Sequence, residues 1–184
     1  SCQVSCKMEN STPIGQFRSK VDIADAGEYP NAKRYFFPKI CNQCDDAPCI
    51  VPCPVKGATS KREDGVVMVN ADLCIGCGRC VDACPYGARF LHPHIPVKND
   101  PEKYAKNVPA VKGKKAKDLR VVDKCDYCSH RLAEGIEEPA CVRNCPGKAR
   151  SFGDLNDPNS AVAKLKASVQ TTRWHDDFGT KPRT

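Results

Sequence analysis

Apolar and β-branched residues occur along this chain in short runs rather than in long periodic stretches. Each run is a few residues long and has turn residues near it, a pattern that predicts short β-strands. The four runs cover residues 34–40, 66–69, 89–91 and 119–122.

Residues 154–169 carry the strongest helix signal. Asp157 can cap a helix, Pro158 suits the first helical position, and residues 161–167 continue with good helix formers. Residues 92–118 contain four prolines and seven lysines without a clear period, which indicates an inserted loop. In this segment we interpret His92 and His94 as surface histidines; the alternatives are that they ligate a metal or donate to a quinone.

The composition limits what can fill the interior. Only 7% of the 184 residues are aromatic, and the mean hydropathy is −0.52. We therefore expect something other than large side chains to occupy part of the core. No apolar run is long enough to span a membrane. The basic residues neither cluster with aromatic ones nor form a known nucleic-acid module, which argues against nucleic-acid binding.

Fourteen cysteines, many for this length, fall into four groups. In each complete group, two residues separate the first two cysteines and three separate the last two. The third group follows the pattern Cys-x2-Cys-x2-Cys-x3-Cys-Pro, which bacterial ferredoxins use for [4Fe–4S] clusters. The groups are Cys2 and Cys6; Cys41, Cys44, Cys49 and Cys53; Cys74, Cys77, Cys80 and Cys84; and Cys125, Cys128, Cys141 and Cys145.

This spacing has a physical reason. A cubane cluster has four iron corners, and three cysteines in one short loop can supply thiolates to three of them. The fourth cysteine of the run points away and, in two-cluster ferredoxins, binds the neighbouring cluster. A proline follows Cys53, Cys84 and Cys145, where the chain leaves each loop.

Pairing the groups as ferredoxins do predicts three complete ligand sets and one partial set. Cys2 and Cys145 remain as two ligands of a fourth cluster. Four cubanes need four thiolates each, two more than the 14 present, so we expect two further cysteines upstream of Ser1. The alternative is that only three clusters bind. The complete sets are Cys41, Cys44, Cys49 with Cys84; Cys74, Cys77, Cys80 with Cys53; and Cys125, Cys128, Cys141 with Cys6.

Two other uses of cysteine fit the spacing less well. An even count allows a disulfide framework, but repeated pairs two residues apart are typical of metal ligands. A zinc site usually joins two Cys-x2-Cys pairs a dozen or more residues apart. The fourth group alone fits that pattern, with 12 residues between Cys128 and Cys141, and the third group does not.

The surroundings of the cysteines suggest duplication and charge compensation. Cys84-Pro-Tyr-Gly-Ala-Arg89 resembles Cys145-Pro-Gly-Lys-Ala-Arg150, which indicates duplicated ferredoxin modules. Four oxidised clusters with their thiolates carry roughly −8, which the formal charge of +7 nearly offsets. We expect Gly76 and Gly78 to let backbone amides approach a cluster. We expect Ile50, Val51, Ile75 and Val81 to exclude water.

The order and spacing of the groups resemble those of a known family. The chain is similar to the four-cluster iron–sulfur subunit of complex iron–sulfur molybdoenzymes, the dimethyl sulfoxide reductase family. It resembles most the subunits of polysulfide, thiosulfate, tetrathionate and arsenate reductases. The matching segments are CQVSCKMEN, CNQCDDAPCIVPCP, CIGCGRCVDACPYGAR, CDYCSHRLAEGIEEPACVRNCPGKAR and FGDLNDPNS.

The resemblance implies an α+β fold of two pseudo-symmetric, bacterial-ferredoxin-like halves with two [4Fe–4S] clusters each. One half comprises residues 1–33 and 119–153, with the first and fourth cysteine groups. The other comprises residues 34–91, with the second and third groups. Residues 92–118 form an inserted loop, and residues 154–184 form a C-terminal helix and a tail that wraps a partner.

The resemblance also implies an electron-transfer subunit without an active site of its own. Its partners are a molybdopterin catalytic subunit, with molybdenum or tungsten, and a quinone-reactive membrane subunit. The sequence shows no nucleophile–base constellation, phosphate loop or dinucleotide fingerprint. Such subunits are exported with the catalytic subunit, so we expect a periplasmic location, with a cytoplasmic one as the alternative. The alternative function is a standalone soluble polyferredoxin.

Overall fold

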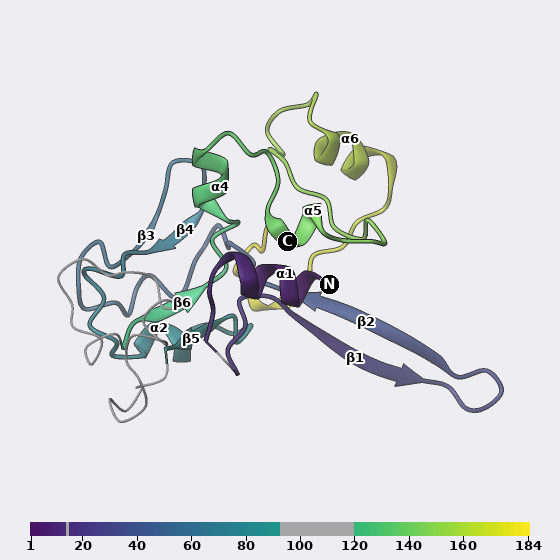
Figure 1. The fold of residues 1–184 in the computed structure, drawn as a ribbon, viewed down its shortest axis with the longest axis horizontal. Helices are drawn as coiled ribbons and strands as arrows, with labels where there is room; N and C mark the ends of the chain where they lie inside the picture. Colours follow the sequence, from purple (N-terminus) through teal and green to yellow (C-terminus); the bar gives the residue numbers. More distant parts are fainter. Residues whose placement is uncertain (14, 93–119) are drawn as a thin grey trace.

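The computed structural model describes residues 1–13, 15–92 and 120–184. In these residues, short helices are mixed with three antiparallel sheets of two strands each, β1–β2, β3–β4 and β5–β6 (Figure 1). This mixture agrees with the predicted α+β class. The strands are β1 Lys20–Ala26, β2 Lys33–Lys39, β3 Thr59–Lys61, β4 Val67–Val69, β5 Arg89–Leu91 and β6 Val122–Lys124; the helices are α1 Cys2–Glu9, α2 Arg79–Asp82, α4 Ser129–Ala133, α5 Ala140–Arg143 and α6 Ala161–Ser168.

Three of the four predicted strands are confirmed to within a residue, as β2, β4 and β5. The fourth is displaced: β6 begins at Val122, where the predicted strand ended, and residue 119 lies outside the described residues. The sequence pattern missed β1, because its residues KVDIADA include two aspartates and two alanines, which β-strands disfavour.

The C-terminal helix begins later than the sequence predicted. Ser160 caps α6, and its Oγ accepts a hydrogen bond from the Ala163 N–H at 3.2 Å. Asp157, the predicted cap, instead accepts from the Asn159 N–H at 2.9 Å in a turn before the helix. Ser160 takes the capping role because it directly precedes an uninterrupted run of helix formers.

The core is small and rich in sulfur. Of the 13 apolar residues that are fully buried in the described part of the protein, eight are cysteines. A cluster of Cys49, Val67, Cys80 and Val122 holds the centre, packed by partly buried neighbours that include Ile50 and Leu91. So few buried aliphatic side chains contribute little hydrophobic stabilisation for a chain of this length. We therefore expect whatever the thiols bind to contribute to the stability of the fold.

A single sheet joins two segments that are distant in the sequence. Strands β5 and β6 pair with Leu91 opposite Val122, on either side of the undescribed residues 93–119. Gln43, 1% exposed, adds a second connection. Its Nε2 donates to the Cys125 carbonyl and its Oε1 accepts from the Val67 N–H, both at 2.8 Å. The two predicted halves thus share hydrogen bonds as well as a sheet.

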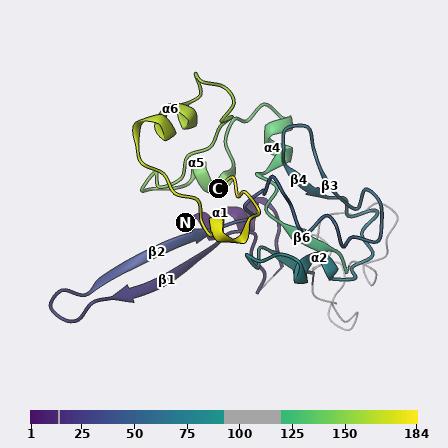
Figure 2. The ribbon, with the colours of Figure 1, turned by 180° about the vertical axis from the view of Figure 1, so that it is seen from behind.

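The β1–β2 hairpin projects away from the rest of the molecule (Figures 1 and 2). Ile23 lies opposite Phe36 in its register, and these side chains are 59% and 61% exposed. Two-stranded hairpins are marginally stable on their own. An exposed apolar pair on such an arm is typical of an interaction surface.

The last residues of the chain lie against the loop that carries the second cysteine group. The backbone N–H groups of Asp45 and Asp46 donate to the carbonyls of Lys181 and Thr180 at 3.1 and 3.2 Å. Arg183 closes the contact with an ion pair to Asp45 at 2.7 Å. The tail predicted to wrap a partner is therefore folded, at its end, onto this chain. In the described residues, no helix is long and apolar enough to cross a membrane.

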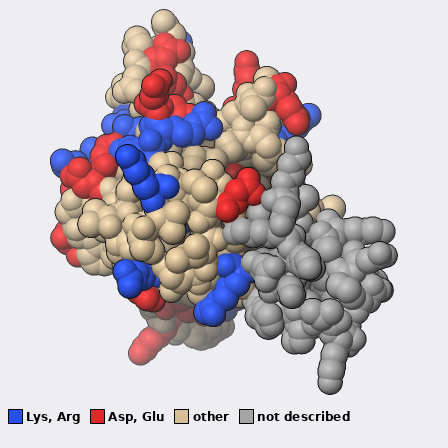
Figure 3. Space-filling view, turned by 90° about the vertical axis from the view of Figure 1, so that its left-hand side faces the viewer, with Lys and Arg blue, Asp and Glu red and all other residues tan. Residues whose placement is uncertain are grey.

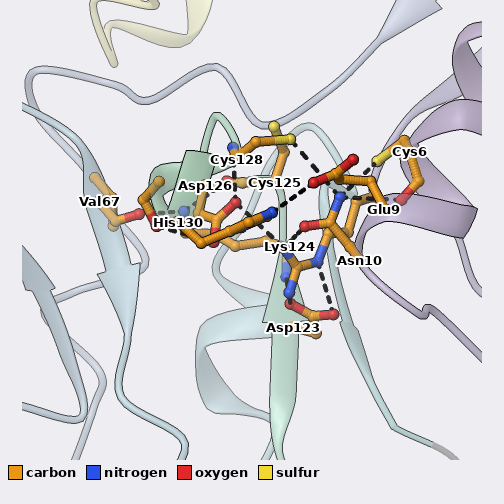
Figure 4. A network of polar contacts seen from close by, with 12 residues as sticks. Cys6, Glu9, Asn10, Val67, Asp123, Lys124, Cys125, Asp126, Cys128 and His130 are labelled. Atoms are coloured by element: carbon orange, nitrogen blue, oxygen red, sulfur yellow. Dashed lines mark hydrogen bonds and ion pairs between the residues drawn. The ribbon is translucent and has the colours of Figure 1, made fainter. Parts of the chain in front are cut away.

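Arg18 is the centre of a buried ion-pair network with Asp123 and Asp126, two residues that Figure 4 labels. Its Nη2 lies 2.8 Å from Asp123 and its Nη1 lies 3.2 Å from Asp126, and the side chains of Arg18 and Asp123 are each 11% exposed. Burial raises the pKa of Asp123, but His92 and Arg18 lower it, with a net decrease. The network links the segment after α1 to β6.

We expect Asp123→Asn to destabilise the protein by about 3 kcal/mol, because removing one partner leaves a buried charge poorly compensated. The measurement is the thermal midpoint of the anaerobically purified, cluster-loaded protein. Asp25→Asn is the matched control, since Asp25 makes an equally short pair with Arg34 at 2.7 Å on the exposed hairpin. Equal midpoints for the two variants would contradict a structural role for the buried pair.

Candidate iron–sulfur sites

The loop after β2 brings the second cysteine group against Cys84. Cys41, Cys44 and Cys49 are buried, and Cys84 is partly buried. Burial raises the pKa of the Cys49 thiol, Arg89 lowers it, and the neighbouring charges of Cys41 and Cys84 raise it. The same two cysteines raise the pKa of Cys44. The structure therefore brings together all four members of this predicted set.

The third group forms around two glycines with left-handed backbone. Gly76 has φ +67°, and a Cβ there would meet the Arg120 carbonyl oxygen at 1.9 Å, so only glycine fits. Burial raises the pKa of Cys80, and charges on Cys74 and Cys53 contribute to the increase. Three members of this set are thus close together. Cys77 is exposed.

The third complete set joins the first helix to the fourth cysteine group. Burial, together with the charges of Cys128 and Cys141, raises the pKa of Cys6 to about 12. Cys125 is deeply buried, and burial raises its pKa more than that of Cys6, with contributions from the charges of Cys41 and Cys6. Helix α1, which carries Cys6, packs on α5, which carries Cys141. All four members of this set therefore meet.

Cys2 and Cys145 are each partly buried beside the third set. Cys2 is close enough for its charge to raise the pKa of Cys141. The Cys145 sulfur accepts a hydrogen bond from the Ala149 N–H at 3.3 Å. No described contact places Cys2 against Cys145, so their assignment to one fourth cluster stays a prediction.

The donor groups fit iron–sulfur clusters. Thiolates are the iron ligands of such clusters. Burial, together with repulsion from neighbouring cysteines, raises the pKa of Cys6, Cys44, Cys49, Cys80, Cys125 and Cys141. Ligation by iron removes that repulsion, because the metal supplies the positive charge. The side chain of Arg89 is a second feature that fits a bound iron–sulfur cluster. It is 3% exposed, and among the described residues its Nε and Nη1 have no hydrogen-bond partner.

Within the described residues, no three His, Cys, Asp or Glu side chains converge on the position of one metal ion. The thiolates of a cubane are bound by four different irons, so they do not need to meet around a single ion. The zinc alternative for the fourth cysteine group would need such convergence.

Several side chains donate hydrogen bonds to the thiols. Asn10 Nδ2 lies 3.6 Å from the Cys6 sulfur and 3.8 Å from the Cys128 sulfur, and its Oδ1 accepts from Arg18 Nη1 at 2.8 Å (Figure 4). The ion-pair network thereby fixes the orientation of the Asn10 amide. Such hydrogen bonds to sulfur raise the reduction potential of a cluster.

Sequence reasoning missed Asn10, Thr180, Gln43 and Lys124 as residues around the sites. Asn10 and Gln43 lie close to cysteines in the sequence, but polar residues near a cysteine are too common to single out. Thr180 approaches Cys44 only because the tail folds back, and Lys124 is buried by the pairing of β5 with β6. Arg89 and Arg150 did carry a signal, since they end the two similar segments after Cys84 and Cys145.

Two expectations about residues near the cysteines were wrong. Val51 and Ile75 are 87% and 64% exposed, so they do not exclude water in this chain, whereas Ile50 and Val81 are partly buried in the core. Figure 3 shows a broad area without charged side chains at the end of the molecule that carries β3, β4 and α2.

His92 is buried rather than on the surface, 3.4 Å from Asp123, and His94 lies outside the described residues.

Comparison with known families places the chain in a class. Two models described as a 4Fe-4S dicluster domain match residues 32–99 and 66–146. The chain is therefore an iron–sulfur protein that holds [4Fe–4S] clusters in paired arrangements.

Its relatives define the family more closely. The chain is 38% identical to a component of the polysulfide reductase of Wolinella succinogenes, with all of this chain and 84% of that protein aligned. It is 41% identical to a subunit of the selenate reductase of Mesobacillus selenatarsenatis, over 99% of this chain and 65% of that protein. It is 39% identical to a subunit of the tetrathionate reductase of Salmonella typhimurium, over 90% of this chain and 56% of that protein.

The protein belongs to the family of 4Fe-4S dicluster iron–sulfur subunits of the dimethyl sulfoxide, selenate, tetrathionate and polysulfide reductases. The predicted resemblance is thereby confirmed. The chain spans less than two thirds of the length of some of these relatives, 65% and 56% for the selenate and tetrathionate reductase subunits.

We expect Thr180→Val to lower the reduction potential of the cluster held by Cys41, Cys44, Cys49 and Cys84. The Thr180 hydroxyl hydrogen-bonds the Cys44 thiol and lies 2.6 Å from the Tyr86 hydroxyl. A hydrogen bond worth about 1 kcal/mol corresponds to roughly 40 mV for a one-electron couple. The measurement is a redox titration followed by electron paramagnetic resonance.

Thr184→Val is the control for this experiment. Thr184 lies in the same tail and bonds Asn42 Oδ1 at 2.5 Å, so its loss loosens the tail without removing the donor to Cys44. If both variants shift the potential equally, the effect comes from tail packing and the role of the Thr180 hydroxyl is wrong.

Proposed function

We propose that this chain relays electrons through four [4Fe–4S] clusters between a molybdopterin catalytic subunit and a quinone-linked membrane subunit. Its relatives are named as components of reductases with more than one kind of chain, which supports a role beside a catalytic partner. A [4Fe–4S] cluster, when bound, accepts and returns one electron at a time. The residues of this chain hold the clusters, exclude water from them and set their potentials.

The observation that carries the proposal is the order of the cysteine sets. Arg89 contacts Cys49 of one set and Cys80 of another. Cys41 is near enough to Cys125 for their charges to interact, and Cys141 has the same relation to Cys2. These contacts support a linear series of neighbouring sets. A linear series of close redox centres suits transfer between two partners at opposite ends.

The cysteine sets at the two ends of this series are more exposed than the sets in its middle. Cys77, in the set with Cys53, Cys74 and Cys80, is exposed, and at the other end Cys2 and Cys145 are only partly buried. The sets between them consist largely of buried thiols. Partners that exchange electrons with this chain would approach the two ends. The exposed apolar residues Val51, Leu73 and Ile75 could cover the first end in a complex.

The proposal includes finer features that stay predictions. The four sets are arranged in two pseudo-symmetric halves, as the repeat after Cys84 and Cys145 suggests. The fourth cluster requires two thiolates beyond Cys2 and Cys145. The protruding β1–β2 hairpin, with its exposed Ile23 and Phe36, is the candidate contact with the catalytic subunit. The complex works on the periplasmic side of the membrane, which fractionation of native cells can test.

The test is metal analysis of the native complex, purified without oxygen. We expect about 16 irons in the clusters of this subunit, in addition to those of its partners, and one molybdenum or tungsten atom per copy. About 12 irons with molybdenum or tungsten would contradict the fourth cluster only. About 12 irons without either metal would contradict the partner as well and favour a standalone carrier.

We expect Cys77→Ser to reduce quinone-linked turnover at least tenfold, because it damages an end cluster of the series. The catalytic subunit should keep its activity with an artificial dye as electron partner, since that route bypasses this chain. Dye-linked turnover is thus an internal control for assembly. Unchanged quinone-linked turnover in a complex that has lost this cluster's signal would contradict the relay.

A further inference from the structure

Two arginines occupy the same position in the repeated segments of this chain. Arg89 follows Cys84 by five residues, and Arg150 follows Cys145 by five residues. Each arginine comes after the proline that ends its cysteine group. Their surroundings in the fold differ, since Arg89 begins β5 whereas Arg150 lies outside any helix or strand.

Arg89 lies between two cysteine sets. Its Nη2 donates to the Cys49 sulfur at 3.0 Å, and Cys80, which packs in the same buried cluster as Cys49, hydrogen-bonds the same side chain. The guanidinium is 3% exposed, and its Nε and Nη1 have no hydrogen-bond partner in the described part of the chain. A buried cation with two unused donors is costly unless negative charge is nearby. The thiolates and sulfides of bound clusters provide such charge.

Arg150 has the equivalent relation to the other pair of sets. Its Nη1 lies 3.9 Å from the Cys141 sulfur, and its Nη2 lies 3.9 Å from the Cys2 sulfur. The Nη2 atom also donates to Ser19 Oγ at 3.1 Å, which holds the side chain in place. Each arginine therefore faces thiols of two different sets. The contact of Arg89 with sulfur is shorter and more buried than the contacts of Arg150.

We propose that Arg89 and Arg150 each set the reduction potentials of two neighbouring clusters at once. The inference rests on the proposed function, because it assumes that the cysteine sets hold clusters. A reduced cluster carries one more negative charge than an oxidised one. A fixed cation that donates hydrogen bonds to its sulfurs favours the reduced form and raises the potential.

Arginine suits this role better than lysine does. The guanidinium stays protonated and presents five N–H donors in a rigid plane, so it can reach ligands of two clusters together. The lysine ammonium is a compact point charge, so it can interact closely with the ligands of only one cluster. Because interactions between charges are stronger in a buried environment, we expect a larger effect from Arg89 than from Arg150.

The test is a redox titration of each cluster, followed by electron paramagnetic resonance, in the purified native complex. Arg89→Met should lower the potentials of the two clusters assigned to the second and third cysteine groups. It should leave the other clusters unchanged. Arg150→Met should lower the potentials of the other pair by a smaller amount. Arg89→Lys, which keeps the charge, should recover part of the shift.

Arg62→Met is the control, because the Arg62 guanidinium is half-exposed and pairs with Asp64 rather than with a thiol. It should leave every potential unchanged. Unchanged potentials in Arg89→Met with full iron content, or the same shift in all clusters, would overturn the proposal. If Arg89→Met loses iron, Arg89→Lys and Arg150→Met decide: a shift confined to the expected pair supports the proposal, and no such shift contradicts it.

These outcomes are distinct from failure of the proposed function. The potentials are measured in clusters that are present, whatever the turnover of the complex. A native complex without cluster signals would overturn the relay and this inference together. Normal signals with unmoved potentials in the variants would overturn the inference alone.

Discussion

The interaction on which this structure depends is the bond between buried thiolates and iron. The chain places cysteines where other proteins of this size place leucine, phenylalanine and isoleucine. Without metal, the sets consist of thiols whose burial and mutual repulsion oppose ionisation, as the raised pKa values of Cys6, Cys49 and Cys80 indicate. Iron bound by such a set would cross-link segments that are distant in the sequence, so we expect folding and cluster binding to be coupled.

Buried polar side chains also connect the segments that carry the cysteine sets. Lys124 is 2% exposed, and its ammonium donates to the carbonyls of Val67 and Cys125. Gln43 donates to the same Cys125 carbonyl. Both side chains lie where the loop of the second cysteine group meets β6. This junction is also the place where Cys41 approaches Cys125. Rigid contacts there keep the distance between two cluster sites constant, on which electron transfer depends.

The sequence could predict candidate cysteine sets because part of their chemistry is local. A loop of three cysteines around one cluster is fixed by spacing, and the exchange of the fourth cysteine follows from that geometry. The structure accordingly brings together Cys41, Cys44, Cys49 and Cys84. It does not do so for Cys2 and Cys145, where the sequence offered no complete group.

The misses concern positions that only the tertiary fold determines. The cap of α6 shifted from Asp157 to Ser160 because the turn before the helix used the aspartate. Thr180 reaches Cys44 through a tail that no local pattern predicts to fold back. Val51 and Ile75 are apolar residues beside cysteines, but the small core has no room to enclose both sides of each loop. Local spacing thus indicates candidate ligands, and long-range packing determines what surrounds them.

The distribution of positive charge revises the idea that the basic surplus of the chain compensates its clusters from within. In the described residues, the buried cations have different partners. Arg18 is neutralised by Asp123 and Asp126, and Lys124 is held by carbonyls. Arg89 and Arg150 are the arginines that contact thiols. Charges on the exposed surface are screened over about 10 Å at ordinary salt and act only weakly on a buried cluster.

Direct compensation therefore comes from a few side chains in contact with sulfur, and the net charge of the whole protein is a poor measure of it. The position of Arg89 and Arg150 at the same point of a repeat is what duplication of one cysteine group would produce. Duplication of one cysteine group, with the segment that follows it, also duplicates the cation that lies between two clusters. Later divergence could then change burial and distance at each copy, as the 3.0 Å contact of Arg89 and the 3.9 Å contacts of Arg150 illustrate. A protein built in this way can adjust its cluster potentials pair by pair without altering the ligands themselves.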